Sequence, residues 1–176
     1  MLCKRVLLLF LIITLTSTVL NQKFTFAEIV KSKRVQAKEI KYNHNSIKIE
    51  ELVSKIGFNV LIPDKLPNDC TLEIKTYPEW ANDGFTQIRL HYMDKDDKVL
   101  LVGIGQRKLS KTQSEFSFQD AETVNINGNK GYFKIYDNAP GGILTWNQEG
   151  TFVEMDSNTV NKQEMIEIAG SMKVFK

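Results

Sequence analysis

The sequence contains few of the residues that crosslink or interrupt a fold. Its 176 residues include two cysteines, four prolines and ten glycines, with no low-complexity tract and no internal repeat. Cys3 precedes the apolar run near the N-terminus, whereas a lipidated cysteine would follow it, so Cys70 is the one thiol in the rest of the chain. One thiol cannot close an internal disulfide, and stability must therefore come from an apolar core. We interpret Cys70 as a small buried hydrophobic residue, with a reactive or intermolecular thiol as the alternative.

Histidine is equally scarce, and the motifs of common catalytic and nucleotide sites are missing. Neither His44 nor His91 has a second histidine four residues away, and HExxH is absent, so a zinc hydrolase has little support. We interpret both histidines as surface residues. GxSxG, the nucleophile elbow, is also absent. Gly103-Ile104-Gly105 lacks the third glycine and the following helix of a dinucleotide site, which favours a bulge or a close backbone approach.

The acidic cluster of Asp94, Asp96 and Asp97 does not fit a calcium loop. An EF-hand loop that began at Asp94 would need glycine at its sixth position and glutamate at its twelfth. Those positions hold Val99 and Gly105. The cluster is therefore typical of a solvated turn between strands. We predict no catalytic residue, no cofactor and no metal site in this chain.

The small basic excess belongs to the N-terminal segment. The chain has 23 lysines and arginines against 21 acidic residues, and residues 1–27 contain three of the basic residues and no acid. The remainder therefore has 20 basic and 21 acidic residues, a net charge of −1. A nearly neutral domain offers no electrostatic argument for a nucleic-acid partner, and we predict none.

Residues 1–27 have the order of a secretory signal peptide. A basic pair is followed by a long apolar run, and then by Ala27 in the small-residue position before a cleavage site. We predict cleavage before Glu28 and a secreted, extracytoplasmic remainder. The uncharged run of residues 6–22 covers 17 positions, the short limit for a hydrocarbon core of about 30 Å, so an uncleaved membrane anchor is the alternative.

Residues 28–46 form a basic lead-in. This segment contains five lysines or arginines and only two glutamates, and its apolar residues follow no clear period. We predict a solvated spacer, with contact to anionic lipid or wall polymer as the alternative. Residues 47–176 then form a single domain of ordinary size.

Two segments have the apolar spacing of an amphipathic helix. Apolar residues stand at i, i+3, i+4 and i+7 in both, and the stripes are Ile49, Leu52, Val53 and Ile56 near the start and Met165, Ile168, Ala169 and Met172 near the end. Gly57 is suited to a left-handed cap after the first helix. Asn161 and Glu164 have the spacing of a capping box before the second. We expect Ile56 and Ile168, at the inner positions, to be buried against a sheet.

Between these helices the apolar period changes to two, as in strands with one buried face. We predict strands at residues 58–62, 71–76, 87–92, 99–104, 124–126, 132–136, 143–147 and 151–155. Asn127-Gly128 is typical of a two-residue hairpin turn, and short turns favour antiparallel pairing. Residues 99–104 are apolar on both faces, which places that strand inside the sheet, and residues 108–120 are expected to form the longest loop.

The predicted fold class is therefore α+β. We expect a curved, mostly antiparallel sheet of about seven or eight strands, with an N-terminal and a C-terminal amphipathic helix packed on it.

Most aromatic residues fall in the predicted strands, but Tyr77-Pro78-Glu79-Trp80 falls in a loop. A large aromatic side chain in a loop has less reason to be buried, and exposed tryptophan is a common anchor for a partner. We name Tyr77 and Trp80 as possible partner-contact residues. Local packing of Trp80 is the alternative.

Several short motifs, taken in order, resemble a known family. They are Gly57-Phe58 with Pro63, Leu66 and Pro67, the segment Val124-Asn125-Ile126-Asn127-Gly128, Trp146 with Gly150, and Asn161-Lys162-Gln163-Glu164-Met165-Ile166 with Ala169-Gly170-Ser171-Met172. Over residues 48–174 the chain is similar to the extracytoplasmic bacterial domain of unknown function 4367, of Bacillus and Clostridium type. The resemblance implies an envelope-facing domain of a Gram-positive bacterium and carries over no catalytic residue.

The chain departs from the family pattern in two respects. The family tends to have glycine and an aromatic residue where this chain has Asp69-Cys70. Many members carry the domain on the membrane helix of an anti-sigma factor, with a cytoplasmic part before it. Only five residues precede the apolar run here, so we do not expect the anti-sigma role.

Three functions are compatible with the sequence. The first is an exported, non-catalytic binding or sensing domain of the bacterial cell envelope, which holds a protein, peptide or envelope polymer by its sheet face, residues 63–67 or residues 77–80. The second is a structural or accessory envelope protein for wall assembly or sporulation. The third is an uncharacterised hydrolase with scattered carboxylates, such as Glu73, Asp83 and Glu154. Membrane contact is expected only through an uncleaved N-terminal segment.

Overall fold

Two antiparallel sheets organise the chain in the computed structural model, which describes residues 40–43, 46–67, 69–110 and 120–176. These residues belong to one compact unit, Ile40–Lys176. The predicted signal peptide, most of the predicted spacer and His44 lie outside the described residues. Those three predictions therefore stay predictions.

The described elements are mostly strands. A single helical turn, α2 (Ile49–Leu52), continues as the 3-10 turn η1 (Val53–Lys55). The strands are β1 (Leu61–Pro63), β2 (Thr71–Tyr77), β3 (Gln87–Met93), β4 (Leu100–Lys108), β5 (Glu122–Ile126), β6 (Asn129–Ile135), β7 (Gly142–Gln148), β8 (Thr151–Ser157) and β9 (Met172–Val174). The helix α3 (Lys162–Gly170) lies between β8 and β9 in sequence.

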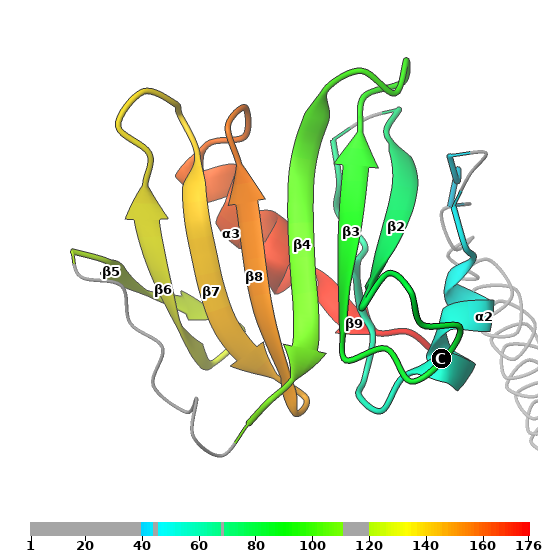
Figure 1. Ribbon diagram of the computed structural model, residues 1–176. Helices are drawn as coiled ribbons and strands as arrows, with labels where there is room; N and C mark the ends of the chain where they lie inside the picture. Colours follow the sequence, from blue (N-terminus) through cyan, green and yellow to red (C-terminus); the bar gives the residue numbers. More distant parts are fainter. Residues whose placement is uncertain (1–39, 44–45, 68, 111–119) are drawn as a thin grey trace, which may run out of the picture. The chain divides into compact units, whose positions relative to one another are not determined.

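The large sheet has seven strands in the order β2-β3-β4-β8-β7-β6-β5, all antiparallel, and β1 and β9 form a separate pair (Figure 1). The predicted antiparallel sheet of seven or eight strands is confirmed. So is the interior position of the strand at residues 99–104, which becomes β4. Asn127 and Gly128 have positive φ, 50° and 85°, as a two-residue hairpin turn requires.

The sheet has one apolar face and one polar face. Along β3, Ile88, Leu90 and Tyr92 are buried, whereas Arg89 and His91 between them are half-buried and point to the other side. Figure 1 shows α3 behind the sheet and none of the described helices in front of β3, β4 and β8. We call the side of the sheet that carries Arg89 and His91 the polar face.

The C-terminal helix α3 is built as its sequence predicts. Asn161 Oδ1 accepts a hydrogen bond from the Glu164 backbone N–H at 3.1 Å, and Glu164 Oε2 accepts one from the Asn161 N–H at 3.4 Å. This capping box satisfies two backbone donors at the start of the helix. Ile168 is buried, and α3 contacts β1, β5, β7 and β8. None of the described helices is long and apolar enough to cross a bilayer.

The predicted N-terminal amphipathic helix is wrong in length. It consists of one α-turn followed by η1, and Ile56 is already extended, with φ −126° and ψ 158°. Ile56 pairs with Phe85 in a parallel bridge and is half-buried rather than buried. Gly57 has no positive φ, so it forms no left-handed cap. Four helical residues are too few to be stable alone, so the bridge to Phe85 decides where the helix ends.

A buried amide joins the small sheet to the large one. The predicted strand at residues 58–62 is shorter and later, Leu61–Pro63. Gln106 of β4 is fully buried, and its Oε1 accepts the Leu61 N–H at 2.8 Å while its Nε2 donates to the Leu61 carbonyl at 2.7 Å. The side chain therefore pairs with β1 as a neighbouring strand would.

Candidate functional site

The strand register places charged residues from separate strands in two rows on the polar face. One row contains Glu73, His91, Gly103 and Asp156, and the next contains Lys75, Arg89, Gly105 and Glu154. Each row crosses β2, β3, β4 and β8. Side chains in neighbouring rows and strands are close enough to interact directly.

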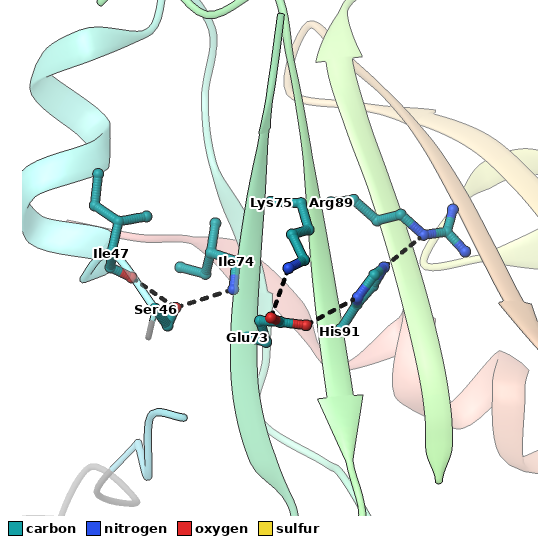
Figure 2. Close-up of polar contacts among 7 residues, drawn as sticks. All are labelled: Ser46, Ile47, Glu73, Ile74, Lys75, Arg89 and His91. Atoms are coloured by element: carbon teal, nitrogen blue, oxygen red, sulfur yellow. Dashed lines mark hydrogen bonds and ion pairs between the residues drawn. The ribbon is translucent and has the colours of Figure 1, made fainter. Parts of the chain in front are cut away.

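An ion-pair network connects these rows. Lys75 Nζ lies 2.6 Å from Glu73 Oε1, and Glu73 Oε2 lies 3.5 Å from His91 Nδ1 (Figure 2). Arg89 Nε donates to His91 Nε2 at 3.0 Å, and the Arg89 guanidinium also pairs with Asp156 of β8. Because His91 Nε2 is an acceptor here, its proton belongs on Nδ1, which faces Glu73. We call these five residues the polar network.

Gly103 makes the Arg89–Asp156 pair possible. A Cβ at Gly103 would lie 2.5 Å from Arg89 Nη2, closer than such atoms approach, and 3.0 Å from Asp156 Oδ1, which is a tight contact. Arg89 therefore crosses β4 through the space that a side chain would fill. The bulge or close backbone approach predicted for the Gly103-Ile104-Gly105 segment is not found at Gly103, because side-chain atoms of Arg89 and Asp156 occupy the space beside it.

Burial and hydrogen bonding set the charges of the network. The hydrogen bond from Lys75 lowers the pKa of Glu73, with a further contribution from His91, so Glu73 is ionised at neutral pH. Burial lowers the pKa of His91, and the charge of Arg89 lowers it further against the opposing effect of Glu73. The His91 side chain is only 21% exposed. The interpretation of His91 as an ordinary surface residue therefore needs correction.

A second polar group, which was not predicted from the sequence, lies on the same face. Arg107 of β4 stacks over the Phe152 ring of β8, with 4.1 Å from Cζ to the ring centroid, and Asn147 of β7 faces Phe152 from the other side. Arg107 Nε, Thr145 Oγ1 and Asn147 Oδ1 are buried, with no hydrogen-bond partner among the described residues. The alternation of side chains along β7 could have predicted this group. Thr145 and Asn147 stand on either side of Trp146 in the sequence, so their side chains point to the face opposite to that of Trp146, which is the polar face.

The connection between β2 and β3, residues 78–86, is fixed by backbone hydrogen bonds. Thr86 N–H donates to the Tyr77 carbonyl at 2.9 Å, and Ala81 N–H donates to the Pro78 carbonyl at 3.1 Å. The buried Phe85 donates its N–H to the Lys55 carbonyl at 3.1 Å, next to the bridge with Ile56. The connection is therefore attached both to its own hairpin and to the end of η1.

The two predicted contact residues differ in position. Trp80 lies in this fixed connection with 87% of its surface exposed. Tyr77 is the last residue of β2 rather than a loop residue, and it is half-buried on the same side of the strand as Lys75. The structure thus places Tyr77 at the edge of the polar face and Trp80 beyond it. Contact of either residue with a partner stays a prediction.

The three carboxylates named for catalysis are separate from one another in the fold. Glu73 and Glu154 are on the polar face, on β2 and β8 respectively, and Asp83 is in the β2–β3 connection. The described residues contain no group of three histidine, cysteine or acidic side chains that could hold a metal ion. Cys70 is half-buried, packs against the core and forms no disulfide with a described residue.

Comparison with known proteins identifies a family. The family described as "Domain of unknown function (DUF4367)" matches residues 60–172, which is more than half of the chain. This confirms membership of the family named from the motifs, over a shorter range that leaves out Gly57-Phe58. The comparisons with curated proteins and with solved structures give no match.

Proposed function

The chain belongs to the DUF4367 family, and on that premise we propose that it is an exported, non-catalytic binding or sensing domain of the bacterial cell envelope, with Trp80 as its main contact residue. The observation that carries the proposal is the exposure of Trp80 on a connection whose backbone is hydrogen-bonded at both ends. Both parts of that observation matter for binding.

The exposure of the Trp80 side chain supplies a driving force for binding a partner. An indole ring that is 87% exposed in the monomer can transfer a large apolar surface to a partner, and tryptophan is enriched among the residues that dominate binding energy. The fixed backbone reduces the entropic cost of association, because the connection does not have to be ordered on binding. A rigid, exposed tryptophan therefore suits recognition better than core packing.

The polar network supports recognition rather than catalysis. A general acid that works near neutral pH needs a raised carboxyl pKa, whereas Lys75 and His91 lower that of Glu73. Arg89 is engaged with His91 and with Asp156. The network thus holds its charged groups in a fixed pattern on a sheet face that none of the described helices covers, which is a surface that a peptide or polymer can contact.

The N-terminal segment supports export. Its order of basic residues, apolar run and small residues is that of a signal peptide, so the secreted protein is expected to begin at Glu28. Mass spectrometry of the protein from the culture medium gives this N-terminus directly. An intact Met1 found only in membranes would favour the anchor.

A photo-crosslinking amino acid at position 80 tests the contact itself in secreting cells of the source organism. Position 135 is the matched control, because Ile135 is also a large apolar residue, 61% exposed, on the distant strand β6. We expect a discrete crosslinked species from position 80 and none from position 135. Crosslinks of equal yield from both positions, or none from either, would contradict the proposal.

A further inference from the structure

The connection that carries Trp80 is acidic. Residues 78–86 contain Glu79 and Asp83 and have no lysine, arginine or histidine. Both carboxylates are exposed, one directly before Trp80 and the other three residues after it. A partner that contacts the indole ring therefore binds to a connection that contains two exposed carboxylates and no basic side chain. We call Glu79, Trp80 and Asp83 the acidic tryptophan site.

The basic residues beside this site are already paired. Lys55, whose carbonyl accepts the Phe85 N–H, has its Nζ 2.8 Å from Glu51. Lys75, two residues before the end of β2, is paired with Glu73. No ion pair within the described part of the chain includes Glu79 or Asp83. The charge of Lys75 also acts on Glu79, without an ion pair between them. Among the described residues the negative charge of the acidic tryptophan site is therefore only partly offset.

An indole ring and two carboxylates favour the same kind of ligand group. The face of a tryptophan ring attracts an ammonium or guanidinium group through its quadrupole, and a nearby carboxylate attracts the same cation. An anionic partner would instead bring like charges together at the point of closest contact. Two exposed carboxylates in the same short connection can interact with more than one cation, as a polypeptide with several basic side chains would supply.

From this charge pattern we propose that the acidic tryptophan site binds a lysine- or arginine-containing segment of a protein partner, with one basic side chain on the Trp80 ring. The inference rests on the proposed function, in which Trp80 is the contact residue, and it adds the chemistry of the partner. Arginine suits the ring well, because its planar guanidinium also stacks on aromatic faces.

The local charge is measured first, by fluorescence quenching. Trp80 and Trp146 are the two tryptophans, and Trp146 is 2% exposed, so ionic quenchers reach Trp80 almost exclusively. Relative to a free tryptophan amide, we expect caesium to quench the protein more strongly than iodide does. The double variant Glu79→Gln, Asp83→Asn should remove the difference. Stronger quenching by iodide in the unaltered protein would overturn the proposal.

Binding is then measured with a labelled peptide of alternating glycine and lysine or arginine, by fluorescence anisotropy at low salt. We expect Trp80→Ala to weaken binding about tenfold, as loss of a central contact does. Glu79→Gln with Asp83→Asn should weaken it at least threefold. Trp80→Phe keeps an aromatic face and should retain part of the affinity. A peptide with glutamate in place of the basic residues should not bind.

A matched control separates the site from general charge attraction. Asp96, in the turn after β3, is an exposed acid at the other end of that strand, and Asp96→Asn should leave the affinity unchanged. Equal losses from Asp96→Asn and from the site variants would overturn the inference. Crosslinking from position 80 without any binding of the basic peptide would also overturn it, and would leave the proposed function standing. Absence of both would count against the proposed function itself.

Discussion

The part of the large sheet around β7 and β8 and the part around β2 and β3 are stabilised by different means, and we call them the β7–β8 side and the β2–β3 side. On the β7–β8 side, both strands contact α3, a helix with its own capping box, and they are joined by the tight turn at Glu149-Gly150. On the β2–β3 side, α2 is one turn without a side-chain cap, and the chain is positioned by contacts between distant residues. The α3 side therefore depends on local signals, and the β2–β3 side on tertiary contacts.

Function follows the same division in our proposals. Trp80 and four of the five residues of the polar network belong to the β2–β3 side, where Phe85 ties the connection to η1. The fifth, Asp156, is on β8, and Arg89 crosses β4 to reach it. Binding residues commonly lie on segments that a rigid scaffold holds in place. The comparison teaches that the part of the chain with the weakest local signals presents the candidate binding surface.

The largest expected effect is on the core of the α3 side. Ile168→Ala should lower the free energy of unfolding by about 2–5 kcal/mol, because it empties a buried site. Ile56→Ala should cost clearly less, because Ile56 is half-buried at the bridge to Phe85. Urea unfolding of both variants measures the difference. Equal losses would mean that the two sides depend on core packing in the same way.

Removal of the helix cap should have the next largest effect. Asn161→Ala deletes the acceptor for the Glu164 N–H and should cost about 1 kcal/mol. Lys48 occupies the equivalent position before α2 and makes no side-chain cap bond, so Lys48→Ala should cost almost nothing. Thermal unfolding of the pair checks this. A loss from Lys48→Ala as large as that from Asn161→Ala would remove the distinction between the two helices.

The pH dependence of stability reports on the polar network. Since the pKa of His91 is lowered in the folded state, the unfolded chain binds this proton more readily near pH 6. The contribution of neutral His91 to stability is complete above its ordinary pKa of about 6.5 and is lost as the pH falls below it. One such group changes stability by at most about 1.4 kcal/mol per pH unit. Glu73 acts in a lower range, where stability falls as the pH drops through its lowered pKa.

Unfolding at pH 5, 6 and 7 tests the assignment to His91. His91→Gln should remove the slope between pH 5 and pH 6.5, whereas His44→Gln, which changes the other histidine, should leave it in place. A slope that persists in His91→Gln and vanishes in His44→Gln would contradict the assignment.

The smallest expected effect on stability is at Trp80. Because the side chain is almost fully exposed, Trp80→Ala leaves no cavity and should change the melting temperature very little. Trp146→Ala is the opposite case, since that ring is buried in β7, and it should cost about 3–5 kcal/mol. Calorimetry of both variants measures the contrast. A large loss from Trp80→Ala would show that Trp80 is part of the packed structure, and its role as a contact residue would have to be abandoned.

Elements that depend on neighbours in sequence could be predicted. The capping box of Asn161 and Glu164, the hairpin turn at Asn127-Gly128 and the alternation along β3 each need only a few adjacent residues. Their outcome is decided by backbone conformation and by period, both of which are local properties. The antiparallel sheet follows from them, because short turns leave no other way to pair the strands.

The end of the first helix could not be predicted, because a distant residue decides it. The stripe from Ile49 to Ile56 is compatible with two helical turns, but Phe85 pairs with Ile56 and draws it into an extended conformation. Helical propensity over so few residues is weak compared with tertiary packing. The same limit explains Tyr77, whose place in β2 depends on its pairing with Gln87.

By itself, the sequence determined the family, the antiparallel sheet, the capped C-terminal helix and the alternation that gives the sheet a polar face. Only the tertiary structure decided which polar residues meet. Strand order places β8 beside β4, and Gly103 leaves the space through which Arg89 reaches Asp156, 67 residues further along the chain. The physical reason is the separation in sequence of the residues that interact. Turns, caps and periods involve neighbours in sequence, whereas a site is formed by side chains that only folding brings together.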